Sequence, residues 1–421
     1  MMTAAQAPGL YFHTFWTRPQ FVESGPRGSG LIELAAFEAL TWLTSALEAR
    51  RHGRLRLYTD QRGLAFIRNI GLEWVYTDGI STELEAIPEA LDPAVFWSAG
   101  KLFAWASMTE PAVSLDPDAI CWSPVPACAP VVVLHPEELH SEDYRHQRAR
   151  YGTFGFEDAG WDWEAAPANA GVLMIADPAF ARSYAAESIR FMMAFSTFLN
   201  RSDPGRGTSD GRWGDAMLFA EQRLVSMLLR RQGLRGAALA GYDVRRQHLS
   251  LNPHCLHLWG TKQFYPRCRD ARVAYSNHLI RHLQRSFPES GATLRRWHLD
   301  QPIALESLAA DPAPPFPLKD ARQGYCRLGR IHGALEIQDA NLDVRRPGYP
   351  GALVGLAEIL HPAEGTSFEL TEVRRTELMH KHFNQSPSHA AQDLPGATPE
   401  PGLHPGPPAR DAIAAAGAMD C

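Results

Sequence analysis

An α/β fold, with a mostly parallel sheet flanked by helices on both faces, is predicted by the order of apolar patterns along the chain. Short runs rich in aromatic and β-branched residues alternate with longer segments whose apolar residues recur at helical spacing. This alternation is typical of βαβ units, whose strands pair in parallel. Because ligands of such sheets bind beyond the carboxyl ends of the strands, polar residues that directly follow a strand are the first candidates for a site.

The predicted elements start with an aromatic strand at 9–16 and a helix at 31–51 that crosses over to the next strand. The elements that follow are a strand at 55–60, a helix at 63–70, a strand at 72–76, an amphipathic helix at 101–105, a strand that starts at 112, strands at 131–134 and 171–175, and helices at 178–199 and 215–231. Gly53 and Gly71 end the first two helices in this interpretation.

Composition narrows the class of protein. The 421 residues are 45% hydrophobic, carry a formal net charge of −6 and include six cysteines. Nucleic acid is not an expected partner, because the chain lacks the basic field that neutralises phosphates. No run approaches the ~20 apolar residues of a transmembrane helix and the N-terminus lacks the pattern of a signal peptide, so we expect a cytoplasmic protein with free thiols. A zinc site built from His254, Cys255, His257 and Cys268 is the alternative for two of the cysteines.

The chain divides into three predicted parts. Residues 9–270 carry the alternating pattern and form the main α/β domain. Residues 271–383 form an extension of unknown role, in which we expect a basic amphipathic helix at 274–287 and a small strand unit at 325–338. Residues 384–421 are rich in Pro, Ala, Gly and His and have too little apolar content to build a core, so we predict a disordered tail.

Asp116 and Asp118 stand where the strand that starts at Ala112 should end. Residues i and i+2 of a strand point to the same face, so both carboxylates can converge on one cation. Hard oxygen ligands that leave other coordination positions open suit a Mg²⁺ or Mn²⁺ ion bound to the phosphates of a substrate. The alternative is an ordinary Asp-Pro-Asp turn, and these residues taken alone favour that alternative.

The order of the motifs resembles that of the retaining glycosyltransferases of the GT-A fold, most closely the family that includes glycogenin and the bacterial lipopolysaccharide glucosyltransferases. The motifs that carry this resemblance are the strand 57–60, the helix Lys101-Leu102-Phe103-Ala104-Trp105, the pair Asp116 and Asp118, the strand Asn169-Ala170-Gly171-Val172, the pair Glu221-Gln222, and the closing segment His257-Leu258-Trp259-Gly260-Thr261-Lys262. The chain is also similar to a bacterial family with the same series of motifs. The similarity covers residues 9 to 268.

The resemblance implies a Rossmann-related GT-A domain that transfers a sugar from a nucleotide-sugar donor to a glycan or another hydroxyl acceptor. It implies a UDP-sugar as the preferred donor and retention of configuration as the outcome. It implies a Mn²⁺ or Mg²⁺ cofactor. By the same resemblance, the metal ligands are Asp116, Asp118 and His257, and the donor-binding residues are Asp60, Lys101, Gly260 and Lys262. The catalytic candidates are Asn169, Glu221 and Gln222, of which Asn169 and Gln222 would position the sugar.

Departures from the family pattern support a competing hypothesis. Glu221 stands where the family has an aspartate, the closing segment is one residue short before Lys262, and Pro117 occupies the centre of the D-x-D motif. These differences favour a non-catalytic GT-A-like protein that binds a nucleotide or a glycan.

Three assignments keep an alternative. Asp60 either contacts the base or ribose of a donor or is a solvated residue that opens a turn. His257 either binds the metal or is a packed core histidine. The aromatic residues of the segment 140–166 either form an acceptor-side loop, because flat rings beside polar groups suit sugars, or pack onto the domain.

Overall fold

The structure is a computed structural model that describes residues 8–23, 32, 34–141, 143–202, 213–239, 242–243, 248–249, 255–258, 269–303, 326–331 and 334–340. The chain forms two compact units, Met1–Thr366 and Ser367–Cys421, and every described residue lies in the first. The predicted tail at 384–421 therefore lies outside the described residues, and the three-part division of the chain stays a prediction.

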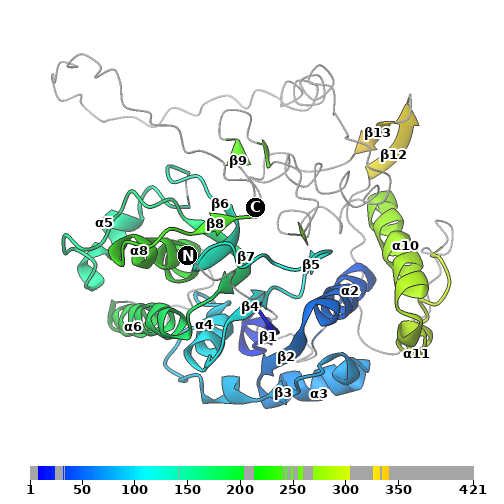
Figure 1. The fold of residues 1–421 in the computed structure, drawn as a ribbon, viewed down its shortest axis with the longest axis horizontal. Coiled ribbons are helices and arrows are strands. Elements are labelled where there is room, and N and C mark those ends of the chain that lie inside the picture. The colour runs from blue at the N-terminus through cyan, green and yellow to red at the C-terminus, as the bar shows by residue number, and fades with distance from the viewer. Residues whose placement is uncertain are drawn as a thin grey trace, which may run out of the picture. The chain divides into compact units, whose positions relative to one another are not determined.

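A seven-stranded sheet forms the centre of the first unit and confirms the predicted fold class (Figure 1). Its strands, in spatial order, are β3 (Ile80–Ser81), β2 (Arg54–Thr59), β1 (Leu10–Phe15), β4 (Ala112–Leu115), β7 (Ala168–Ile175), β6 (Val131–Pro136) and β8 (Ala237–Ala238). Neighbours pair in parallel except at β7, which is antiparallel to both β4 and β6. Three segments consequently meet at one edge of the sheet, the edge formed by the carboxyl ends of β1, β2, β4 and β6. They are the residues that follow β4, the residues that follow β6 and the first residues of β7.

Helices cover both faces of the sheet. The central strands are therefore buried on both sides, and their sequences are nearly continuous apolar runs. Along β1 the side chains alternate between two core clusters: Tyr11 belongs to one, and Leu10 and Phe12 belong to the other. The first cluster includes α2 (Ala36–His52), α3 (Gln61–Ile70), α10 (Arg269–Ser286) and α11 (Gly291–Arg296), and the second includes α4 (Ala99–Ala106), α5 (Gln147–Tyr151), α6 (Pro178–Ser202), α7 (Gly214–Leu218) and α8 (Leu224–Arg231).

Several short elements complete the described part. Helix α1 (Arg18–Glu23) follows β1, and β5 (Ala119–Cys121) pairs antiparallel with β11 (Cys255–His257) outside the main sheet. Two further antiparallel pairs are β9 (Tyr242–Asp243) with β10 (His248–Leu249), and β12 (Cys326–Ile331) with β13 (Ala334–Ala340). The second pair lies where the sequence predicts a small strand unit.

The strand predicted at 72–76 is wrong. Residues Glu73–Val75 form a turn of 3₁₀ helix, and the edge position of the sheet is taken by β3 instead. Leu72 and Val75 are buried while the two residues between them are exposed. That spacing of three residues is the repeat of a 3₁₀ turn, whereas a half-buried strand would bury every second residue.

The first part of the predicted extension packs onto the main domain. Leu279 and Leu283 of α10 belong to the same core cluster as Leu40 and Leu43 of α2, and Tyr275 donates to or accepts from Thr41 at 2.6 Å. Helix α10 therefore belongs to the structure that supports the sheet.

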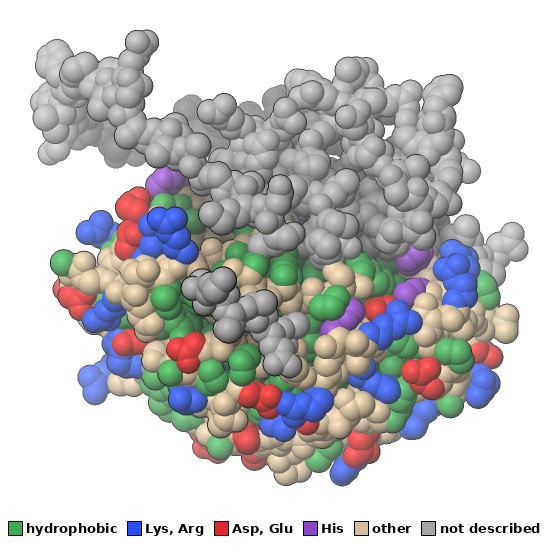
Figure 2. All heavy atoms as spheres, viewed as in Figure 1, with side chains coloured by type: hydrophobic (Ala, Val, Ile, Leu, Met, Phe, Trp, Pro, Cys, Tyr) green, Lys and Arg blue, Asp and Glu red, His purple; other side chains and the backbone are tan. Residues whose placement is uncertain are grey.

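Charges of both signs are interspersed over the face of the described residues that Figure 2 shows. Among the described helices, none combines the length and the apolar character needed to cross a membrane.

Candidate metal centre

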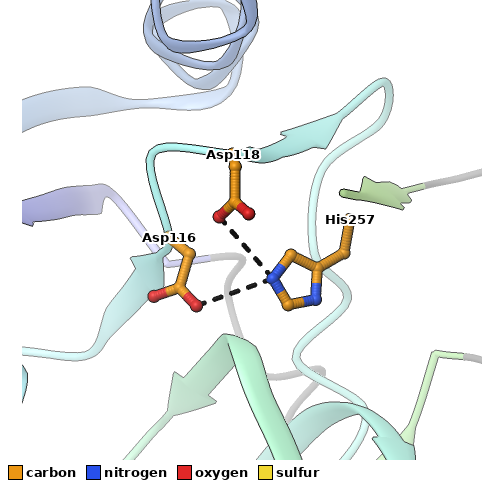
Figure 3. Close-up of side chains that lie close together, drawn as sticks. All are labelled: Asp116, Asp118 and His257. Atoms are coloured by element: carbon orange, nitrogen blue, oxygen red, sulfur yellow. Dashed lines mark ion pairs between the residues drawn. The ribbon is translucent and has the colours of Figure 1, made fainter. Parts of the chain in front are cut away.

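Asp116 and Asp118 lie in a tight turn between β4 and β5. The Ala119 N–H donates to the Asp116 carbonyl at 2.8 Å, which closes a four-residue turn with Pro117 at its second position, where a proline φ is favourable. Strand β4 ends at Leu115, so strand pleating does not align the two carboxylates. The turn interpretation is therefore confirmed, and the turn itself brings the two carboxylates close together (Figure 3).

His257 joins the two aspartates through strand pairing. In the antiparallel pair of β5 and β11, His257 lies opposite Ala119, and the Leu258 N–H donates to the Asp118 carbonyl at 3.1 Å. The imidazole packs against Gly171 of β7, where an added Cβ would lie 2.4 Å from the ring. Glycine at 171 is therefore required for the histidine to reach this position.

The three side chains fit a shared cation. The distances from His257 Nε2 to Asp116 Oδ2 and to Asp118 Oδ1 are both 3.6 Å, which is too long for a hydrogen bond (Figure 3). One ligand atom from each residue lies within 4.8 Å of the other two, so a single ion between them can reach all three. Carboxylates suit Mg²⁺ and Mn²⁺, and an imidazole ligand suits transition metals.

Lys101 of α4 lies behind this cluster. The residue is 1% exposed, and its ammonium contacts Asp116 Oδ1 at 2.6 Å, the Ala170 carbonyl at 3.0 Å and the Glu221 carboxylate. These partners occupy all three N–H donors of the ammonium. Burial lowers the pKa of Lys101, but the two carboxylates outweigh that effect and raise it above its ordinary value. Lys101 thus holds Asp116 in place and leaves Oδ2 of that carboxylate to face His257.

Glu221 reaches Lys101 from a π-helical turn, Phe219–Arg223, between α7 and α8. Such turns are rare and often occur at functional sites. The hydroxyl of Ser188 donates to the Ala220 carbonyl at 2.7 Å, and the hydroxyl of Tyr184 donates to the Glu221 carbonyl, so α6 supplies donors to backbone carbonyls of the turn. Burial raises the pKa of Glu221, and the charge on Lys101 opposes that rise.

The charge of the cluster favours a divalent cation. When ionised, the carboxylates of Asp116, Asp118 and Glu221 carry more negative charge than the ammonium of Lys101 offsets. An excess of like charge is costly in a site where Asp118 is 8% exposed and Glu221 is 5% exposed. A dication between Asp116, Asp118 and His257 would balance this charge.

Asn169 and Gln222 lie beside the cluster in hydrogen-bonded positions. Asn169 Nδ2 donates to Glu137 Oε1 at 2.9 Å, and Asn169 Oδ1 accepts from the Gly171 N–H at 3.0 Å. Gln222 Oε1 accepts from the hydroxyl of Tyr144. Because Gly171 also contacts His257, Asn169 is linked through one residue to this candidate metal ligand.

Glu137 is a residue that the sequence analysis did not identify. It follows β6 at the same sheet edge, its side chain is 14% exposed, and burial raises its pKa to about 7, while the hydrogen bond from Asn169 lowers it. A carboxyl group with this pKa can accept or release a proton near neutral pH. The rule that selected Asp116, a polar residue directly after a strand, could have found Glu137 as well.

Asp60 has a structural role in the described geometry. One oxygen accepts from the Gly63 N–H at 2.7 Å and caps α3, and the other accepts from the backbone N–H and the hydroxyl of Thr17 at 2.8 and 2.7 Å. The residue is 5% exposed, so the alternative of a solvated turn residue does not hold. Its carboxylate ties the end of β1 to the start of α3.

The aromatic residues of the segment 140–166 pack onto the domain. Those that are less than 8% exposed are Tyr144, Tyr151, Phe156, Trp161 and Trp163. Most of them belong to the core cluster of α6 and α8, where Phe156 and Trp161 stack edge to face with ring centroids 5.0 Å apart. Buried rings cannot stack on a sugar, so packing accounts for these residues.

Four predicted site residues lie outside the described residues. They are the donor-binding Gly260 and Lys262, and His254 and Cys268 of the alternative zinc site. The other two members of that alternative separate, because His257 faces the aspartates while Cys255 faces Cys121.

Comparison with known proteins adds three findings. One solved structure that is similar to the chain is the crystal structure of mouse xyloside xylosyltransferase 1 in its apo form, with 13% sequence identity and a TM-score of 0.27 over 54% of this chain and 84% of that chain. A similarity this weak says nothing about activity. No curated protein matches the sequence. The chain belongs to a family of unknown function (DUF6734), whose model matches residues 11–240.

Proposed function

We propose that this protein is a metal-dependent glycosyltransferase of GT-A type, which moves a sugar from a nucleotide-sugar donor to a hydroxyl acceptor such as a glycan. The observation that carries the proposal is the convergence of Asp116, Asp118 and His257 on one point at the sheet edge where open α/β sheets bind ligands. A UDP-sugar is the donor of first choice, and Mn²⁺ the cofactor of first choice because of the imidazole ligand. A cytoplasmic location remains a prediction from the sequence.

The proposed chemistry is electrostatic. Cleavage between an anomeric carbon and a nucleotide diphosphate places negative charge on the leaving phosphate, and a divalent cation at this site would offset that charge. Asp116, Asp118 and His257 would hold the ion, while Lys101 and Glu221 fix Asp116. Gly260 and Lys262 would contact the diphosphate, since a glycine permits close approach of the backbone and a lysine supplies positive charge.

The sugar would lie on the side of Asn169, Gln222 and Glu137. Asn169 and Gln222 have hydrogen-bonding groups that could position sugar hydroxyls. To do so, they would exchange their present hydrogen bonds with Glu137 and Tyr144 for bonds to the sugar. Glu137 would exchange a proton with an acceptor hydroxyl, because burial raises the pKa of its carboxyl group to about 7. Retention of configuration is the outcome that the GT-A family resemblance favours.

A non-catalytic GT-A-like binding protein is the second candidate. It is favoured by the finding that two residues predicted to contact a donor, Asp60 and Lys101, direct their polar atoms to groups of the protein itself. Such a protein would bind a nucleotide or a glycan with the same metal but would not transfer a sugar.

The test is to incubate the purified full chain with a set of UDP- and other nucleotide sugars and Mn²⁺, with and without a chelator. Binding is measured by calorimetry, and release of the free nucleotide reports turnover. We expect both to require Mn²⁺, and we expect Asp118→Asn to lower turnover on the order of 10²-fold. The control is Asp158→Asn, whose carboxylate is 58% exposed and should have no effect.

The two candidates predict different results in this experiment. Mn²⁺-dependent binding without turnover, in the presence of glycan acceptors, would favour the binding protein. Absence of both binding and turnover for all nucleotide sugars would contradict the glycosyltransferase proposal.

A further inference from the structure

A pair of buried cysteines lies in the same strand pairing as His257. Cys121 of β5 and Cys255 of β11 are directly opposite each other in the antiparallel pair, with their sulfur atoms 2.8 Å apart. Both are free thiols, and they are 0% and 4% exposed. A disulfide bond is ~2.05 Å long, so the sulfurs need to move by less than about 1 Å to form one.

We propose that Cys121 and Cys255 form a reversible disulfide that locks β11, and with it His257, onto β5. The proposal concerns a modification site, and it holds for either of the functions considered above because the covalent link does not depend on the reaction at the metal centre.

The location of the pair gives the link a consequence. Strand β11 has three residues and pairs with β5, and Cys255 comes two residues before His257. The separation of β11 from β5 would also take His257 away from Asp116 and Asp118, since the pairing brings these residues together. A covalent bond at Cys255 opposes that separation directly.

The oxidant is a low-molecular-weight disulfide of the glutathione type. A thiolate of one cysteine attacks the reagent, forms a mixed disulfide and releases one small thiol; the second cysteine then attacks the mixed disulfide and releases the other. Two protein thiols are oxidised to one disulfide, and one small disulfide is reduced to two thiols, so hydrogens and electrons balance. A dithiol reductant reverses the reaction.

The rate of oxidation is limited by the access of the oxidant to the two buried thiols. The contact with Cys255 and burial both raise the pKa of the Cys121 thiol, which disfavours the reactive thiolate in the closed structure. Attack therefore requires local opening of the short β11 strand, a process that is much easier than global unfolding. We expect slow oxidation that becomes faster under mild denaturing conditions.

The primary experiment uses the wild-type full chain, so no variant needs to fold. The protein is incubated with oxidised glutathione, remaining thiols are blocked with an alkylating reagent, and peptides are mapped by mass spectrometry. We expect a peptide pair cross-linked through Cys121 and Cys255, which disappears after treatment with dithiothreitol. Cys128→Ser, which removes an exposed thiol, should give the same cross-link.

Two results would overturn the proposed disulfide. One is modification of Cys128 by glutathione with no cross-link at Cys121, even in mild denaturant. The other is stable glutathione adducts on both buried cysteines, which would show that the sulfurs do not reach each other once β11 opens.

The second measurement tests the lock on His257, with Mn²⁺ alone as the probe. We expect the oxidised protein to release Mn²⁺ several-fold more slowly than the reduced protein, and to melt at a higher temperature because the bond closes a loop between positions 134 residues apart. Equal release rates in a cross-linked sample would refute the lock. Absence of nucleotide-sugar turnover, in contrast, would affect only the proposed function.

Discussion

Two aspartates follow parallel strands at the same edge of the sheet, and they have different roles. Asp60, after β2, accepts three hydrogen bonds from Thr17 and Gly63, which occupy both of its oxygens. Asp116, after β4, gives one oxygen to Lys101 and directs the other toward His257. The position after a strand thus selects candidates for a site, but the partners of each carboxylate oxygen decide whether it can bind a ligand.

The contrast is tested most strongly at Lys101, whose replacement by methionine should have the largest effect. The change keeps most of the length of the side chain but leaves Asp116 and Glu221 without their cation in a buried position. Removal of one partner of a buried ion pair typically costs about 3–5 kcal/mol. We expect a loss of this order in urea unfolding without metal.

Two comparisons check the origin of that loss. Adding Glu221→Gln to Lys101→Met removes a buried carboxylate that has lost its cation, so the double variant should recover part of the lost stability. An unchanged unfolding free energy for the single variant would show that the ammonium is not needed to stabilise the carboxylates.

His257→Ala should separate binding from stability. We expect a fall on the order of 10²-fold in the affinity for Mn²⁺, a typical cost of disturbing a metal site, with a melting temperature close to that of the wild type in the absence of metal. Competition with a fluorescent chelator measures the affinity. Full retention of Mn²⁺ binding would place the metal elsewhere.

Asp60→Ala should show the opposite behaviour. Loss of the helix cap and of the bonds from Thr17 should lower the unfolding free energy by about 2 kcal/mol, because buried donors lose their acceptor. The affinity for Mn²⁺ should not change. If the variant keeps its stability but loses nucleotide-sugar binding, Asp60 contacts the donor after all.

The smallest expected effect concerns Glu137 and pH. Its pKa is raised from an ordinary 4.5 to about 7, chiefly by burial, so the folded protein binds a proton that the unfolded chain releases at lower pH. The stability contributed by protonated Glu137 is present below pH 4.5 and is lost as the pH rises through about 7. Glu137→Gln should remove this loss, so the variant should gain stability relative to the wild type as the pH rises from about 5 to about 8.

Urea unfolding at several pH values in the presence of a chelator measures this difference. A constant difference between variant and wild type across the range would contradict the raised pKa. The amide introduced by Glu137→Gln keeps an oxygen that can accept from Asn169, so the hydrogen bond need not be lost in the comparison.

The layered α/β fold could be predicted from the amino-acid sequence, because the periodicity of helices and strands leaves a direct signature in the order of apolar and polar side chains. The strands 112–115 and 171–175 read as apolar runs since both of their faces are covered. Asp116 and Asp118 were also identifiable, because one short turn brings both of them together. The segment 72–76 was misread because its apolar residues fit a strand in composition, while their burial follows a 3₁₀ turn.

The groups of the candidate site that are far apart in the sequence could be identified only in the folded chain. His257 joins the aspartates because β11 pairs with β5 in a register that no local pattern specifies. The ammonium of Lys101 contacts protein carboxylates instead of being open to a ligand. The reason is that folding brings α4 next to Asp116 and to Glu221 of the π-helical turn. The free energy of a buried charge depends on all the groups around it, and those groups come together only when the chain folds.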